Sequence, residues 1–320
     1  MTVNRTHRRT QYRLIYESLL KNPRINIKDI ASVLGVNRNA ASKILREAFD
    51  QGFVLKPQIR KRSYANLKEY IYFVNCSYPF DSYRQYSTNN DVVYHAVMDG
   101  FANFWLVSYK KIDIDGAIAI HGPRSDYLVA YAPDHSWETA MQIMRDKVRK
   151  FNPEHYEPQS LIKTRFDETI EWDSEDEILY GEFKYDVRKP LTPVMKKHLI
   201  SGQKIYAWLK RLPQCCTIFP RFFPLSIAGY DPYLFMFETA YEDFIIDLFS
   251  ELPTSSLFFK IGNTLFLYGN VDRSSLRKVG IDMSDVSQLH IPLLVDHLLK
   301  KGILQNESHA IIAYHWRKDL

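Results

Sequence analysis

The first sixty residues alternate between amphipathic segments and short polar breaks. Apolar residues recur at helical spacing in three segments, residues 12–20, 27–34 and 38–49. Asn26 and Asn37 stand directly before the second and third segments, where an Asn side chain caps a helix N-terminus. Gly35 and Gly52 follow the same two segments, where a residue of positive φ commonly ends a helix. The pattern predicts three short helices with a tight turn between the last two.

The second and third of these helices form a helix-turn-helix pattern. Ala31 and Ala41 lie on their inward faces, and such small residues allow two helices to cross closely. The start and the outward face of the third helix are polar and basic: Asn37, Arg38, Asn39, Ser42, Lys43 and Arg46. Arg pairs with guanine and Asn with adenine in the major groove of DNA. We therefore expect this helix to read DNA bases.

The segments on either side of the three helices are also basic. Residues 53–64 are interpreted as the β-hairpin of a winged helix. We expect the cations of this wing and of the N-terminal arm to bind DNA phosphates: Arg60, Lys61, Arg62, Arg8 and Arg9.

The two halves of the chain follow one plan at an offset of about 163 residues. Beyond each helix-turn-helix, the pattern predicts strand, helix, strand, strand, helix and strand, the ferredoxin-like order. In the first half these elements are residues 70–76, 80–86, 92–98, 103–108, 136–150 and 156–162. In the second half they are residues 233–238, 241–252, 257–261, 264–268, 291–300 and 309–316.

This plan predicts an α+β protein of two tandem modules, each a winged helix followed by a ferredoxin-like βαββαβ domain. The expected domains are a winged helix at 1–64, a ferredoxin-like domain at 65–163, an altered winged helix at 164–228 and a second ferredoxin-like domain at 229–320. We expect the two ferredoxin-like sheets to pack on each other within one chain.

The net charge of +5 is distributed unevenly along the 320 residues. Residues 1–62 hold 14 Lys and Arg against four acidic residues, so the rest of the chain is net negative. Clustered cations attract a polyanion, because binding releases counterions from its phosphates. The charge therefore supports DNA contact at the N-terminal winged helix.

Composition argues against a membrane or metal-binding protein. No apolar run is long enough to span a bilayer, and the basic N-terminus lacks the apolar core of a signal peptide. Cys76, Cys215 and Cys216 have no CxxC spacing, and we expect them to be reduced. We expect a cytoplasmic protein without a metal or another cofactor.

The N-terminal segment resembles the leucine-responsive and asparagine-synthesis (Lrp/AsnC) regulators. The matching positions are Leu14-Ile15, Leu19, Asn22, Arg24, Ile30-Ala31 and Leu34-Gly35, and Ile178-Leu179 and Arg188 repeat part of the pattern. The resemblance implies a transcription regulator that dimerises through its second domain and senses a small molecule there. It would place an effector site at Gly100 and Asn103.

Three departures weaken the case for amino-acid sensing. Tyr12 stands where the family has Asp, and the family's Gly-x-x-Asp ends in Asn103 in the first half and in Leu265 in the second. The loops at 110–133 and 272–290 are also longer than in the family.

The second helix-turn-helix differs from the first in chemistry. Its third helix, residues 201–212, carries Tyr206 and Trp208, an apolar wing follows it, and acidic residues precede it at 173–177. An acidic, aromatic surface suits a protein partner better than phosphate. We expect a docking or structural role for this copy, with one DNA reader per chain and therefore a homodimer on a palindromic site.

One alternative is that the chain is an enzyme. His95 lies ahead of Gly100, and Asn103-Phe104-Trp105 follows, a pattern similar to the siroheme decarboxylases, which place a His beside a tetrapyrrole. A protein-docking adaptor that does not bind DNA is a further alternative. The basic winged helix led us to expect a sequence-specific DNA-binding regulator without enzyme activity.

Overall fold

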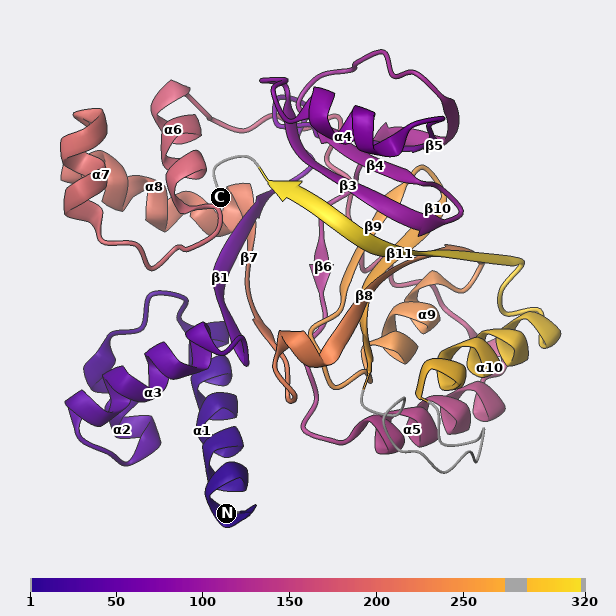
Figure 1. Cartoon of the computed structure of the whole chain (residues 1–320), viewed down its shortest axis with the longest axis horizontal. Coiled ribbons are helices and arrows are strands. Elements are labelled where there is room, and N and C mark those ends of the chain that lie inside the picture. Colours follow the sequence, from indigo (N-terminus) through magenta and orange to yellow (C-terminus); the bar gives the residue numbers. More distant parts are fainter. Residues whose placement is uncertain (1, 274–286, 318–320) are drawn as a thin grey trace. The chain divides into compact units, whose positions relative to one another are not determined.

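A computed structural model describes residues 2–273 and 287–317 of the chain (Figure 1). The chain divides into two compact units. Unit 1 is Met1–Lys61 with Ile170–Ala228, and unit 2 is Arg62–Thr169 with Gly229–Leu320. Each unit thus takes one segment from either half of the sequence. The predicted α+β class is confirmed, with a winged helix at the N-terminus and antiparallel sheets.

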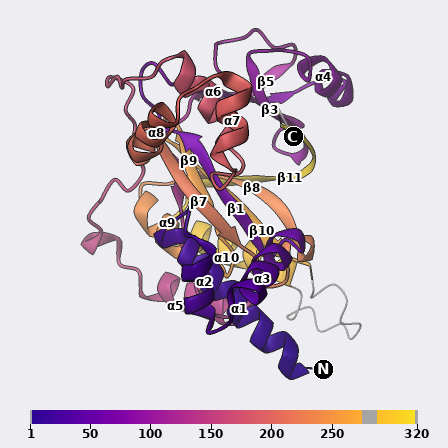
Figure 2. The ribbon, with the colours of Figure 1, turned by 90° about the vertical axis from the view of Figure 1, so that its left-hand side faces the viewer.

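Unit 1 holds both helix-turn-helix segments and a two-stranded ribbon (Figure 2). Its elements are α1 (Thr2–Lys21), α2 (Ile27–Leu34), α3 (Arg38–Asp50), β1 (Val54–Lys61), α6 (Ser174–Phe183), α7 (Leu191–His198), α8 (Gly202–Cys215) and β7 (Cys216–Phe222). The side chains of Asn26, Asn37, Asp173 and Ser201 cap α2, α3, α6 and α8. The predicted caps Asn26 and Asn37 are thus confirmed.

The predicted β-hairpin wing at 53–64 is wrong. Residues 54–61 form the single strand β1, which pairs antiparallel with β7 from Val54 opposite Phe222 to Lys61 opposite Cys216. The segment has no Asn-Gly or similar pair that would turn a hairpin. Pro57 lies at the one irregularity of the ladder, where a missing amide donor is tolerated. Each winged helix therefore completes its wing with the strand of the other.

Unit 2 is built on a nine-stranded sheet with the order β5-β2-β4-β3-β11-β8-β10-β9-β6. Its strands are β2 (Tyr70–Asn75), β3 (Val92–Gly100), β4 (Phe104–Ser108), β5 (Ala117–Pro123), β6 (Leu128–Val129), β8 (Tyr230–Glu238), β9 (Leu257–Ile261), β10 (Thr264–Asp272) and β11 (Asn306–Arg317). Its helices are α4 (Pro79–Tyr86), α5 (Trp137–Lys150), α9 (Glu242–Phe249) and α10 (Ser287–Lys300). Short 3-10 turns occupy Pro153–His155 and Ile227–Gly229.

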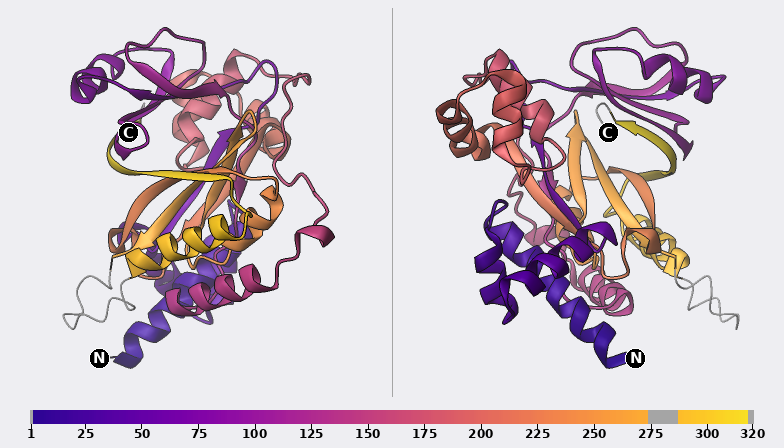
Figure 3. Two further views of the ribbon diagram at one scale, coloured as in Figure 1. Left: turned by 90° about the vertical axis from the view of Figure 1, so that its right-hand side faces the viewer. Right: turned by 60° about the vertical axis from the view of Figure 1, so that its left-hand side comes forward.

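The strands of the two halves join where β3 pairs with β11 (Figure 1). One core of unit 2 draws its apolar side chains from both halves, with Phe73 and Trp105 from the first and Phe259 and Phe266 from the second. A second core forms where α5, α9 and α10 cover β8 and β10. Figure 3 shows α5 beside α10, so the second helix of the first half covers the sheet of the second half.

The closing strand predicted at 156–162 is also wrong. The carboxylate of Asp243 at the start of α9 accepts the main-chain N–H groups of Gln159, Ser160 and Leu161. Amides that a strand would direct to its neighbour are therefore bound to a side chain. The position beside β2 is filled by β5, which lies in the segment 110–133 expected to be a loop. In the second half the predicted order of strands and helices is confirmed, although residues 274–286 of the long loop lie outside the described residues.

Three further findings on the described residues concern membrane spans, metal ligands and cysteines. None of their helices is long and apolar enough to cross a membrane. Across the described ranges, no group of three or more His, Cys, Asp or Glu is placed to hold a metal ion. Cys76, Cys215 and Cys216 are all buried and unbridged.

Candidate nucleic-acid interface

The fold fixes α3 rigidly against α2 through its inward face. Ala41, Ile44 and Ala48 are buried, and the Asn37 side chain accepts the main-chain N–H of Ala40 at 2.9 Å. Gly35 turns the chain between the two helices with a φ of 63°, a conformation that glycine adopts without steric cost. Asn37 therefore serves as a helix cap, and its side chain is not directed to a base.

The opposite face of α3 carries the residues that were expected to read DNA. Arg38, Asn39, Lys43 and Arg46 are exposed, and Ser42 is half-buried between them. Within the part of the chain that the structure describes, no acidic side chain pairs with Arg38, Lys43 or Arg46. A helix that presents cations and an amide on one solvent-facing side has the shape and the chemistry to enter a major groove.

Glu47 holds α1 against α3 from the flank of this face. The hydroxyl of Tyr12 donates to Glu47 Oε1 at 2.8 Å, and Arg8 lies 3.0 Å from Oε2. Burial, and then the hydrogen bond to Glu47, raise the pKa of Tyr12 above its ordinary value. Arg8 is thus bound to Glu47 and to Gln11, whereas Arg9 is exposed. Of the two expected arm residues, Arg9 is exposed and Arg8 is half-buried.

The three basic residues expected on the wing lie in internal contacts. Lys61 is buried, with its ammonium group 2.7 Å from both carboxylate oxygens of Glu177. Arg60 donates to the main-chain carbonyls of Ile59 and Lys184. Arg62 pairs with Asp126 at 3.0 Å within unit 2. We do not include these residues in the interface, because Lys61 is buried and the cations of Arg60 and Arg62 are held by other groups of the protein.

The corresponding helix of the second helix-turn-helix, α8, has two of its three cations neutralised. Lys204 lies 3.1 Å from Asp176, and Arg211 lies 2.7 Å from the other oxygen of the same buried carboxylate. Tyr206 is 67% exposed between them. Asp176 of α6 thus binds two of the three cations of α8, which supports the expected difference between the two helices.

The two residues expected at an effector site have structural roles. A Cβ atom on Gly100 would overlap the main-chain carbonyl of His309 where β3 meets β11, so the position requires glycine. The Asn103 side chain forms two 2.8 Å hydrogen bonds with the main chain of Cys76 and joins the ends of β2 and β4. These contacts account for both residues, and an effector at this place stays a prediction.

His95, the residue of the enzyme alternative, is fully buried beneath α4. Its ring packs edge-to-face on Tyr83 at 4.7 Å and lies 5.8 Å from Phe104. Burial lowers the pKa of His95 to about 4, although a hydrogen bond to the main chain of Tyr83 acts in the opposite direction. The imidazole is therefore neutral at neutral pH, and Tyr83 separates it from solvent.

Two sets of known proteins resemble the chain in different ways. Residues 10–54 match the family described as winged helix-turn-helix DNA-binding. No curated protein matches the chain. The predicted winged helix-turn-helix at the N-terminus is thus confirmed, and it suggests DNA binding.

The fold of the whole chain is similar to that of an enzyme. The crystal structure of the siroheme decarboxylase NirDL aligns over 96% of this chain and 92% of its own, with a TM-score of 0.50 and 11% identity. The same enzyme in co-complex with an iron-uroporphyrin III analogue aligns over 95% and 92%, with a TM-score of 0.46 and 13% identity. Our expectation that the chain is not an enzyme is overturned by this likeness, because the fold that led us to a regulator is also that of a decarboxylase.

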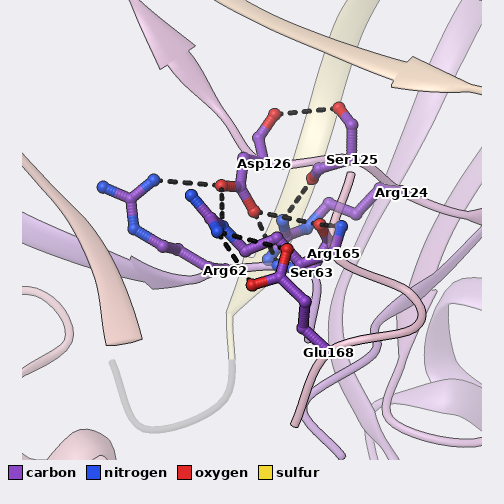
Figure 4. Close-up of polar contacts among 7 residues, drawn as sticks. All are labelled: Arg62, Ser63, Arg124, Ser125, Asp126, Arg165 and Glu168. Carbon is purple, nitrogen blue, oxygen red and sulfur yellow. Dashed lines mark hydrogen bonds and ion pairs between the residues drawn. The ribbon is translucent and has the colours of Figure 1, made fainter. Parts of the chain in front are cut away.

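Besides the basic face of α3, the structure contains a cluster of basic residues in unit 2 that was not predicted from the sequence. Arg62 and Arg165 both pair with the carboxylate of Asp126 (Figure 4), and Lys163 lines the same pocket. These residues are far apart in the sequence and share no motif, so only the folded chain brings them together.

Proposed function

We propose that the chain binds double-stranded DNA through the exposed face of α3 and acts as a transcription regulator. The observation that carries the proposal is the chemistry of this face: Arg38, Lys43 and Arg46 point outward from a helix of the winged helix-turn-helix class. Arg38 and Asn39 supply the donors that guanine and adenine accept in the major groove. Lys43, Arg46 and Arg9 supply charge for the phosphates.

The charges of the two helix-turn-helix segments support a single DNA-reading helix per chain. The acidic residues of α6 bind Lys204 and Arg211 of α8, and the cations of α3 have no such partners in the described chain. A palindromic DNA site needs two reading helices about one helical turn apart. The proposal therefore includes a homodimer, with the finer assignment to an Lrp/AsnC-type regulator resting on the residues shared with that family.

A fluorescence anisotropy titration tests the proposal. Full-length protein is titrated with a labelled duplex from upstream of its own gene and with a random duplex, over a series of salt concentrations. Affinity should fall steeply with salt and should be higher for the upstream duplex. Binding of neither duplex at low salt would refute DNA binding.

A second candidate is chemistry on a tetrapyrrole, as in the siroheme decarboxylase of similar fold. Fold alone favours this candidate, because the alignment includes the winged helices as well as unit 2. The enclosure of His95 under Tyr83 does not favour it, because a ring ligand would have to displace α4 to reach the imidazole.

Absorption spectroscopy separates the two candidates. Purified protein is titrated with an iron porphyrin carrying several carboxylates, and the visible absorption band of the porphyrin is followed. A saturable shift of that band which is lost in His95→Gln would support tetrapyrrole chemistry. An unshifted band, together with salt-sensitive DNA binding, would leave the regulator as the function.

A further inference from the structure

A small pocket in unit 2 is lined by cations and by apolar side chains. Its volume is about 290 Å³, and its lining includes Arg62, Lys163 and Arg165 with the apolar residues Leu128 and Ile162. All of these residues belong to the segment 62–169, so unit 2 forms the pocket by itself.

The carboxylate of Asp126 sets the positions of two of the cations (Figure 4). Its Oδ2 atom accepts from Arg62 at 3.0 Å and from Arg165 at 3.1 Å. Its Oδ1 atom accepts the main-chain N–H and the hydroxyl of Ser63 at 2.7 and 3.0 Å. Burial alone would raise the pKa of Asp126, but the hydrogen bonds from Ser63 and Arg62 outweigh it and hold the pKa below the ordinary value. The two guanidinium groups are therefore fixed beside an ionised carboxylate before any ligand arrives.

The charge at this pocket exceeds what Asp126 neutralises. Three cations line it against the single carboxylate of Asp126, and that carboxylate is 5% exposed. Glu168 lies 3.2 Å from Arg165, but it is not among the lining residues and its side chain is 56% exposed. Among the described ion pairs, none involves Lys163. Two fixed Arg residues and an exposed Lys form an arrangement that binds carboxylate or phosphate groups in other proteins.

We propose that this pocket binds a small organic dianion. Its carboxylate or phosphate groups would lie at Arg62, Lys163 and Arg165, and its short carbon skeleton would contact Leu128 and Ile162. The volume of about 290 Å³ fits a ligand of a few carbon atoms. The inference is independent of DNA binding, because it concerns residues of unit 2 alone.

Isothermal titration calorimetry of the full-length protein tests the proposal with two probes, inorganic phosphate and succinate. The decisive variant is Lys163→Glu, which reverses one charge of the pocket and leaves the contacts of Asp126 intact. The matched control is Lys150→Glu, an exposed lysine that lines a neighbouring cavity of unit 2 beside Phe151 and Phe244 and does not line the proposed pocket. Thermal unfolding of each variant confirms that it folds.

We expect at least one probe to bind, with affinity about tenfold or more weaker in Lys163→Glu and unchanged in Lys150→Glu. Binding of phosphate alone would identify a phosphate ester as the ligand class, and binding of succinate alone would identify a dicarboxylic acid. The proposal is overturned if neither probe binds at millimolar concentration, or if both variants lose the same affinity.

Discussion

Arg24 and Arg188 each bind the main chain of the other's helix-turn-helix segment. The Arg24 guanidinium donates to the carbonyls of Val187 and Lys189, and Arg188 donates to the carbonyl of Ile25 at 2.7 Å. Burial lowers the pKa of both side chains below the ordinary value of arginine, although nearby Asp186 opposes the shift. The sequence offset had aligned these two residues, and in unit 1 they make the same contact in opposite directions.

This reciprocal contact predicts that Arg188→Ala destabilises unit 1. The substitution leaves the carbonyls of Pro23 and Ile25 without their charged donor, and we expect a loss of about 1 to 3 kcal/mol in the free energy of unfolding. Urea unfolding followed by tryptophan fluorescence measures it. Arg84→Ala is the control, because Arg84 is 81% exposed and we expect its loss to change stability by less than about 0.5 kcal/mol. Equal effects of the two substitutions would contradict the structural role of Arg188.

The burial of Lys61 predicts a separation between stability and DNA binding. Lys61→Met breaks the ion pair with Glu177 and the cation–π contact with Tyr180, and it should cost about 1 to 3 kcal/mol of stability. Its effect on the salt dependence of DNA binding should be negligible, because the ammonium group does not face solvent.

Lys43→Met is the matched comparison for Lys61→Met. Lys43 is exposed on α3, so its loss should weaken DNA binding and leave the urea midpoint unchanged. If Lys61→Met lowers the salt dependence of DNA binding as much as Lys43→Met does, then Lys61 binds a DNA phosphate. Its ion pair with Glu177 would then be broken in the DNA complex.

The buried His95 predicts a stability that falls in mild acid. Its folded pKa of about 4 lies below the ordinary value of 6.5, so the unfolded chain takes up a proton in a pH range where the folded chain does not. Stability from this group is complete above the unfolded pKa and is lost as the pH falls toward the folded pKa, by at most about 1.4 kcal/mol for each pH unit.

His95→Gln tests this linkage because it removes the titrating group. We expect the difference in unfolding free energy between the parent and the variant to shrink between about pH 7 and about pH 5. A difference that stays constant over this range would mean that His95 titrates with an ordinary pKa and is open to solvent.

The parts of the fold that local chemistry determines were predicted from the sequence. Asn26 and Asn37 cap the helices that they were expected to cap, because an Asn side chain accepts the amide of a nearby residue in the same turn. Except for β5 and β6, the strands of unit 2 were also predicted. In β2, Ile71 and Phe73 face the core shared by the two halves, and Tyr72 and Val74 face a separate apolar cluster that includes Tyr86 of α4.

The parts that depend on distant partners were not predicted. The basic run Arg60-Lys61-Arg62 looked like a phosphate-binding wing, but its partners Glu177, Lys184 and Asp126 lie far along the chain. The segment 156–162 does not form the predicted strand for the same reason, because its main-chain N–H groups bind the distant carboxylate of Asp243. Charge counting identified the basic first domain, yet it did not distinguish exposed Arg38 and Arg46 from buried Lys61.

The most direct test of the account compares two double variants in the DNA titration. Arg38→Ala/Arg46→Ala removes two cations from α3, and Lys196→Ala/Lys210→Ala removes two exposed cations from α7 and α8 of the second helix-turn-helix. We predict that the first variant binds the upstream duplex at least about tenfold more weakly than the parent protein and that the second binds within about twofold of it. Equal losses in both variants, or no binding by the parent protein at low salt, would contradict the claim that α3 reads DNA.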